Sequence, residues 1–203
     1  IAGHAPLTLR ATKEAIRRIG EKLRLEDDQD LVLMCYMSQD FKEGMDAFLA
    51  HVANSDFKSI SYEQYHLTPE PVLKKMVAAS PRTIITLSPE SSDQRVATLS
   101  GRGVYTMREM EDWIERAMDL GVFEIDIWFF IGMPEQDERK VMEDVEYCRH
   151  LLHKFRGRRV MPYMCPMIPF LDPASTFFEH PDAHGYRVFF RTVEEHRVGM
   201  TRP

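Results

Sequence analysis

Two patterns of apolar residues divide the chain near residue 54. Before that point, apolar residues recur every three or four positions, which predicts amphipathic helices over about 7–25, 28–36 and 40–51. After it, short β-branched and apolar runs predict strands over about 58–62, 83–87, 124–131 and 160–165. The sequence therefore predicts a helical segment followed by an α/β region.

Helical patterns fill the intervals between the predicted strands. Thr68 and Pro69 suit a helix start, and Thr106 with Glu109 forms a capping-box pattern. The helix that follows Thr106 has a predicted inward face of Met110, Trp113, Ile114, Ala117 and Met118. Further helices are predicted over about 182–196 and over about 137–153, the latter with an inward face of Val141, Val145, Cys148 and Leu152. Strands separated by helices pair in parallel through right-handed crossovers. We therefore expect an α/β fold with four parallel strands, a TIM-like half barrel.

The predicted organisation has three parts: a helical segment over 1–50, a linker over 51–57 and the half barrel over 58–203. The chain begins at Ile1, which is not a methionine, and ends at Pro203 in a polar stretch. We therefore expect a fragment or a fusion of a longer protein.

Composition excludes several classes of function. The net charge is −6, with 26 Lys and Arg against 32 Asp and Glu and no basic tract, so no nucleic-acid partner is expected. Apolar runs such as 127–131 are too short to cross a membrane, and the first residues lack a signal-peptide pattern. The three cysteines are widely spaced, which predicts no disulfide framework and a cytoplasmic location.

Candidate binding residues cluster where the predicted strands end, because ligands of parallel α/β folds bind at the carboxyl ends of the strands. The carboxylate of Glu90 can accept two hydroxyl hydrogen bonds from a ribose, or bind an amino group. Gly132 lacks a Cβ and would let a ligand approach the backbone. The expected site residues are Ser88, Glu90, Ser91, Gly132, Pro134, Glu135, Cys165 and Pro166.

Each of these residues also has a plain structural explanation. Glu90 suits a solvated loop or a helix N-cap beside Ser91, the segment 132–135 suits a simple turn, and Cys165 suits the core. Histidine is a common metal ligand, and His180 and His184 are four positions apart. Pro181 interrupts any helix between them, so their geometry is not fixed and no metal site is expected.

Four segments at the predicted strand ends carry a resemblance to a known family. They are Ser59-Ile60-Ser61-Tyr62-Glu63, Leu87-Ser88-Pro89-Glu90-Ser91, Ile131-Gly132-Met133-Pro134-Glu135 and Pro166-Met167-Ile168-Pro169-Phe170-Leu171-Asp172-Pro173. Residues 55–203 thereby resemble the C-terminal half of a radical S-adenosylmethionine (SAM) domain, of the kind that follows a cobalamin-binding domain. The resemblance implies contact of Ser88 and Glu90 with SAM. It also implies that the loop from Gly132 and the end of the strand at Cys165 lie near adenine.

The family's Cys-x-x-x-Cys-x-x-Cys motif, which binds a [4Fe–4S] cluster, is absent from this sequence. The resemblance thus implies an enzyme that cleaves SAM reductively, with its cluster ligands and any cobalamin domain outside these residues. We expect this chain alone to be inactive, and its substrate is not indicated.

The helical segment resembles a different family. Residues 5–16 and 38–49 are similar to the C-terminal helices of the crotonase superfamily of enoyl-CoA hydratases and isomerases, with the similarity ending at about Ala50. Two alternatives therefore remain open: a crotonase fragment, and a non-catalytic binding or assembly module that self-associates through its N-terminal helices.

Overall fold

The structure, a computed structural model, describes residues 6–20, 34–35, 37–167, 171–173 and 175–201. The chain folds into two compact units, Ile1–Lys58 with Ala78–Ser80, and Ser59–Val77 with Pro81–Pro203. In the first unit, α1 spans Pro6–Gly20 and α3 spans Gln39–Ala53. The helix α3 therefore continues through the first three residues of the predicted linker. The helix expected over 28–36 lies outside the described residues except at 34–35, which are helical.

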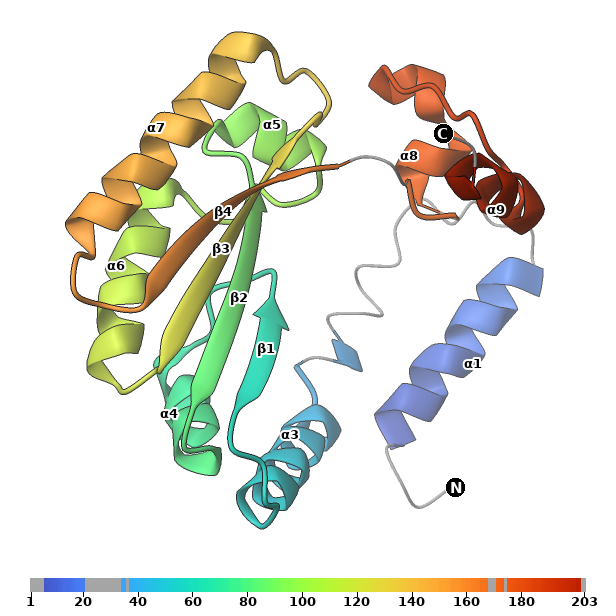
Figure 1. The fold of residues 1–203 in the computed structure, drawn as a ribbon. Helices are drawn as coiled ribbons and strands as arrows, with labels where there is room; N and C mark the ends of the chain where they lie inside the picture. The colour runs from blue at the N-terminus through green and yellow to red at the C-terminus, as the bar shows by residue number, and fades with distance from the viewer. Residues whose placement is uncertain (1–5, 21–33, 36, 168–170, 174, 202–203) are drawn as a thin grey trace. The chain divides into compact units, whose positions relative to one another are not determined.

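The second unit contains an all-parallel sheet. Within the described residues its strands are β1 (Ile60–Gln64), β2 (Thr83–Glu90), β3 (Glu124–Ile131) and β4 (Val160–Pro166), in the spatial order β1-β2-β3-β4 (Figure 1). Each strand thus lies beside its neighbour in sequence, as in a β/α barrel. The predicted mixed α/β fold with parallel strands is confirmed.

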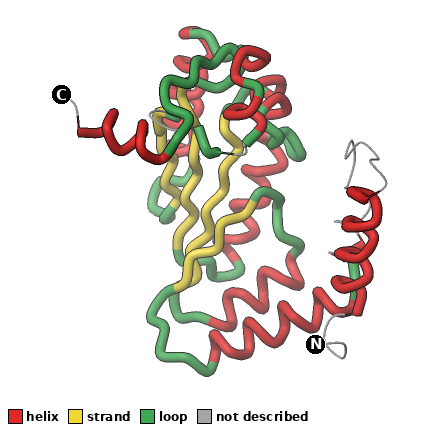
Figure 2. The backbone as a smooth tube through the Cα atoms, turned by 90° about the vertical axis from the view of Figure 1, so that its right-hand side faces the viewer, coloured by secondary structure: helices red, strands yellow, loops and turns green. Residues whose placement is uncertain are grey.

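The crossover helices lie on one face of this sheet. They are α4 (Glu70–Ala79), α6 (Met107–Asp119) and α7 (Glu138–Lys154), and the views in Figures 1 and 2 show them on the same side of the strands. Right-handed crossovers between neighbouring parallel strands require this one-sided arrangement. The short helix α5 (Gln94–Leu99) follows β2. A helix of six residues is too short to show a helical spacing of apolar residues, so α5 was not predicted from the sequence.

Alternate residues of the strands form the core beneath the helices. The side chains of Ile125, Ile127 and Phe129 in β3 are fully buried, and they are joined there by residues of β2 and the helices: Leu73, Ile85, Leu87, Met110, Ile114 and Leu151. Four of the five residues predicted on the inward face of α6 are buried, Met110, Trp113, Ile114 and Ala117, and Met118 is partly buried.

The predicted inward face of α7 is partly correct, because Cys148 is buried and Val141 and Val145 are partly buried. The buried residues of this helix are Asp144, Cys148 and Leu151, whereas Leu152 is 51% exposed. Asp144, Cys148 and Leu151 are four and then three positions apart, which is the regular spacing of one helix face. The first of them is a carboxylate, where an apolar residue was expected. A reading based on hydrophobicity alone therefore selected the neighbouring positions.

The C-terminal part also differs from expectation. The structure has α8 (Thr176–Glu179), a short 3-10 helix η1 (Pro181–His184) and α9 (Val193–Thr201), so the continuous helix predicted over 182–196 is wrong. Gly185 adopts a left-handed conformation with φ 77°, which ends η1. Across the residues that the structure describes, no helix is both long enough and apolar enough to cross a membrane.

The capping box predicted for α6 is present and can be tested. The Thr106 hydroxyl accepts from the amide of Glu109, and the Glu109 carboxylate accepts from the amide of Thr106 at 2.7 Å. We expect Thr106→Ala to lower the free energy of unfolding by about 1 kcal/mol, because it leaves helix N–H groups without a partner. Urea unfolding followed by tryptophan fluorescence measures this loss.

Thr98→Ala is the matched control, because the exposed Thr98 hydroxyl only donates back to the carbonyl of Gln94 within α5. Equal losses in the two variants would contradict a stabilising role for the cap.

Candidate functional site

The expected site residues come from three strand ends that meet at one edge of the sheet. Glu90 at the end of β2 lies opposite Phe129 in β3, and Cys165 in β4 lies opposite Phe130. Gly132 follows β3 directly. Because all strands run in the same direction, these residues share the carboxyl edge. The sequence predicted this grouping correctly.

The end of β2 is irregular in a way that redirects Glu90. The pairing with β3 shifts register between Leu87 and Glu90. Glu90 itself has φ 70°, a conformation that is uncommon for any residue other than glycine. Such irregularities re-aim side chains and are concentrated next to functional sites. Ser88, two residues earlier, is buried.

The Glu90 carboxylate is buried beside a guanidinium group. Glu90 is 8% exposed, and the Nε of Arg102, in the loop after α5, donates to its carboxylate at 3.0 Å. The Arg102 guanidinium also stacks over the ring of Tyr65, 4.0 Å from its centroid. Burial raises the pKa of Glu90 above its usual value, Arg102 opposes this shift and Glu63 adds to it. The ionised carboxylate is therefore held by a single cation in a largely dry position.

Tyr65, Tyr105 and Tyr186 all lie within electrostatic range of Glu90, and the last two have the more deeply buried hydroxyl groups. The Tyr105 hydroxyl is buried and has no hydrogen-bond partner among the described residues, and burial raises its pKa to about 12. The Tyr186 hydroxyl donates to the carbonyl of Gly132 at 2.8 Å, and burial together with Glu90 raises its pKa to about 12. Both stay protonated at neutral pH and remain hydrogen-bond donors.

Gln136 binds three backbone groups in and beside the loop after β3. Gln136 accepts from the amides of Gly132 and Met133, at 2.8 and 3.1 Å, and donates to the carbonyl of Phe130 at 2.9 Å. Gly132 is exposed and has φ 100°, and a Cβ added there would meet the side chain of Met167 at 4.0 Å, an ordinary contact. Pro134 is buried in this turn. The amide of Gly132 is therefore engaged within the loop, and its carbonyl accepts from Tyr186.

Other expected residues are engaged in interactions within the protein. The Glu135 carboxylate is exposed and accepts two hydrogen bonds from Arg95, at 2.5 and 2.9 Å. The Ser91 hydroxyl is fully buried and donates to Asp144 at 2.9 Å. These interactions turn Ser91 and Glu135 away from Glu90. Cys165 is partly exposed and Pro166 is exposed.

The sequence reading missed two residues of this edge, Arg102 and Asp144. Arg102 follows the loop glycine Gly101, and no pattern links it to Glu90, 12 positions earlier. Asp144 could have been found from its helical spacing to Cys148 and Leu151. Within the described part of the chain, no group of three or more His, Cys, Asp or Glu residues is arranged to hold a metal ion.

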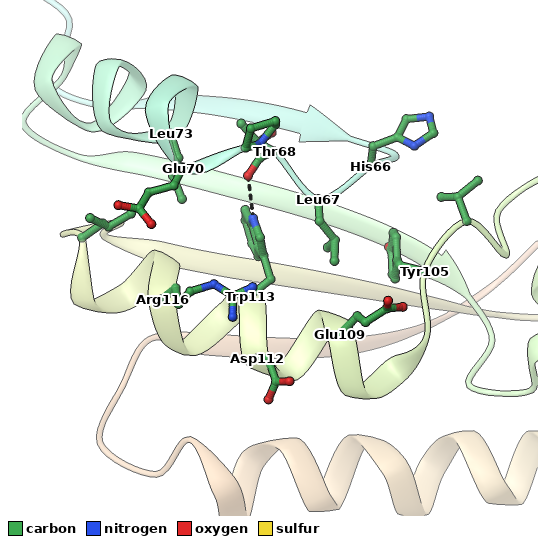
Figure 3. Close-up of a pocket in the computed structure, with 13 residues that line it drawn as sticks. His66, Leu67, Thr68, Glu70, Leu73, Tyr105, Glu109, Asp112, Trp113 and Arg116 are labelled. Carbon is green, nitrogen blue, oxygen red and sulfur yellow. Dashed lines mark hydrogen bonds between the residues drawn. The ribbon is translucent and has the colours of Figure 1, made fainter.

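A cavity of about 500 Å³ lies on the helical side of the unit, between α4 and α6. Figure 3 shows the residues that line it, among them Tyr105 and Trp113, whose indole N–H donates to the carbonyl of Thr68 at 2.8 Å. Two of its carboxylates are already engaged, since Glu109 caps α6 and Glu70 pairs with Lys74 at 2.6 Å. The carboxyl edge, where the carboxylate of Glu90 is buried beside one guanidinium, is therefore the better candidate.

Comparisons of the chain with protein-family models, with curated proteins and with solved structures gave no match. The function is therefore inferred from the residues and geometry of the carboxyl edge.

The cysteine environments give a test of this part of the fold. Burial raises the pKa of Cys148 to about 11, with Asp144 adding to the shift, so only about 0.1% of this thiol is ionised at pH 8. Cys165 is partly exposed at the strand end. We expect iodoacetamide at pH 8 to modify Cys165 in the native protein well before Cys148, as measured by mass spectrometry of tryptic peptides.

The control is the protein unfolded in urea, in which both thiols should react at similar rates. Equal labelling of Cys148 and Cys165 in the native protein would show that α7 does not bury Cys148.

Proposed function

We propose that residues 58–203 are the SAM-binding half barrel of a radical SAM-type enzyme. The order of the strands supports this proposal, since four consecutive parallel strands with helices on one face correspond to half of an eight-stranded barrel. The single observation that carries it is the Glu90–Arg102 pair at the carboxyl edge. A buried carboxylate beside a guanidinium, on a strand end with an unusual backbone, is typical of a ligand site.

The chemistry of this pair matches the polar groups of SAM. The ligand carries an ammonium group, a carboxylate and two ribose hydroxyls. Glu90 accepts hydrogen bonds from the ammonium group or the hydroxyls, and Arg102 donates to the carboxylate. Because burial raises the pKa of Glu90, a cationic ligand group adds the second positive partner that the ionised carboxylate lacks.

The adjoining strand ends would hold the rest of the ligand. Gly132 is exposed and lacks a Cβ, so a flat adenine ring would be able to approach its backbone closely. Polar backbone groups near Cys165 and Pro166, at the end of β4, would then face the base. Ser88 lies on the same strand end as Glu90 and would contact the ribose. In this proposal Ser91 and Glu135 hold the loops, because their side chains bond to Asp144 and Arg95.

In such enzymes a reduced [4Fe–4S] cluster would supply the electron for reductive cleavage of SAM into methionine and a 5′-deoxyadenosyl radical. The residues present here do not fit the cluster, because Cys148 is buried within α7 and Cys165 stands alone at the end of β4. The role of this chain is therefore to bind and orient SAM and to exclude water from it. We assign no catalytic residue to it, no residue to cobalamin and no substrate.

Two other proposals concern the N-terminal unit. The helices α1 and α3 coincide with most of both crotonase-like segments, which supports a crotonase-like tail over residues 1–50. Exposed apolar side chains on these helices, Ile16 at 63% and Phe48 at 47%, instead favour an assembly module that docks to a partner. Concentration-dependent self-association without SAM affinity would favour the assembly module.

SAM affinity tests the proposal directly. We expect isothermal titration calorimetry to detect SAM binding, and Glu90→Gln to weaken it about tenfold, since a charged hydrogen bond contributes about 1.5–3 kcal/mol. The substitution removes the charge while keeping the size of the side chain and its backbone preference. Glu143→Gln is the matched control, because Glu143 is exposed on α7 and pairs with Arg139. A wild-type chain without SAM affinity, or equal affinities in the Glu90 and Glu143 variants, would overturn the assignment.

A further inference from the structure

Asp144 is a fully buried carboxylate that receives hydrogen bonds from two different loops. It lies on α7 with none of its surface exposed. One oxygen, Oδ1, accepts from the amide and the hydroxyl of Ser92, at 2.6 and 2.5 Å. The other, Oδ2, accepts from the hydroxyl of Ser91 at 2.9 Å and from the side-chain amide of Gln136 at 3.0 Å. Among the described residues, Oδ1 thus binds the loop after β2 alone, whereas Oδ2 accepts from both the loop after β2 and the loop after β3.

These contacts lie directly beside the ligand-binding positions of the proposed site. Ser91 is the residue after Glu90, whose unusual φ of 70° needs support from its surroundings. Gln136 in turn fixes the amide of Gly132 and the carbonyl of Phe130. One carboxylate on α7 therefore sets the positions of Glu90 and Gly132 relative to each other.

Packing alone does not explain an aspartate at this position. The donors that reach Asp144 are neutral: two serine hydroxyls, one backbone amide and one glutamine amide. Burying a carboxylate costs free energy, and neutral donors recover it only when they are held in good geometry. An apolar residue would complete the stripe of Cys148 and Leu151 without that cost. Unlike an apolar side chain, the carboxylate forms directional hydrogen bonds, and each of them fixes the position of one loop atom.

We propose that Asp144 is a positioning residue that couples the loops after β2 and β3 into one preorganised ligand-binding edge. Its place as a determinant of SAM affinity rests on the proposed function, whereas the coupling of the two loops does not. Asp144 is buried and does not touch the ligand. It acts through Ser91, Ser92 and Gln136, and it lowers the cost of ordering both loops when a ligand binds.

Hydrogen exchange of the ligand-free protein, read by mass spectrometry, tests the coupling. We expect Asp144→Asn to raise exchange about tenfold in peptides covering both 88–93 and 130–137, because its amide group faces donors and breaks the shared network. Exchange in the core of α7 should stay unchanged. Cys148→Ala is the matched control: it removes packing one turn further along the same buried stripe and leaves the network intact.

Gln136→Ala provides a second variant that keeps Asp144. It should raise exchange in 130–137 and leave 88–93 close to wild type, because Ser91 and Ser92 still reach Asp144. The proposal is supported if Asp144→Asn raises exchange in both loops and Gln136→Ala raises it in the loop after β3 alone. Loosening of one loop or of neither in Asp144→Asn overturns it, as does the same pattern in Cys148→Ala.

A parallel SAM titration separates this proposal from the proposed function. If the wild type binds SAM, Asp144→Asn should weaken binding about tenfold without touching the ligand, and unchanged affinity would overturn its positioning role. If the wild type binds no SAM, the ligand assignment fails, and the exchange experiment still decides whether Asp144 couples the loops.

Discussion

Parallel pairing of four consecutive strands is the constraint on which the rest of the second unit depends. Each right-handed crossover returns the chain to the same end of the sheet, so α4, α6 and α7 cover one face. The same rule brings every strand to its end at a single edge. Residues as distant in sequence as Glu90 and Cys165 reach the same edge, on either side of β3.

Two buried carboxylates at that edge, Glu90 and Asp144, lie in different environments. Glu90 has one cationic partner and a pKa raised by burial, which leaves it able to gain from a further donor. Asp144 has both oxygens occupied by neutral donors and holds the loops. The first environment is typical of a residue that meets a ligand, and the second of a residue that positions others.

The sequence predicted those features that follow from local chemistry. The strand ends, the capping box at Thr106 and the buried face of α6 all depend on residue type and spacing over a few positions. It failed where tertiary partners override local preference. Residue type alone places the polar Asp144 on the outer face of its helix, whereas the structure buries it fully. The ion pair of Arg102 with Glu90 depends on how the loop after α5 folds back. The helix expected over 182–196 failed because Gly185 takes a left-handed conformation.

The central claim is that the three strand ends form one ligand-binding edge. Titration of the ¹⁵N-labelled chain with S-adenosylhomocysteine, followed by NMR, tests it residue by residue. The account predicts that the largest amide shifts fall together at Glu90, Gly132 and Cys165. Shifts confined to a single strand end, or centred on Thr68 and Trp113 in the groove between α4 and α6, would contradict it.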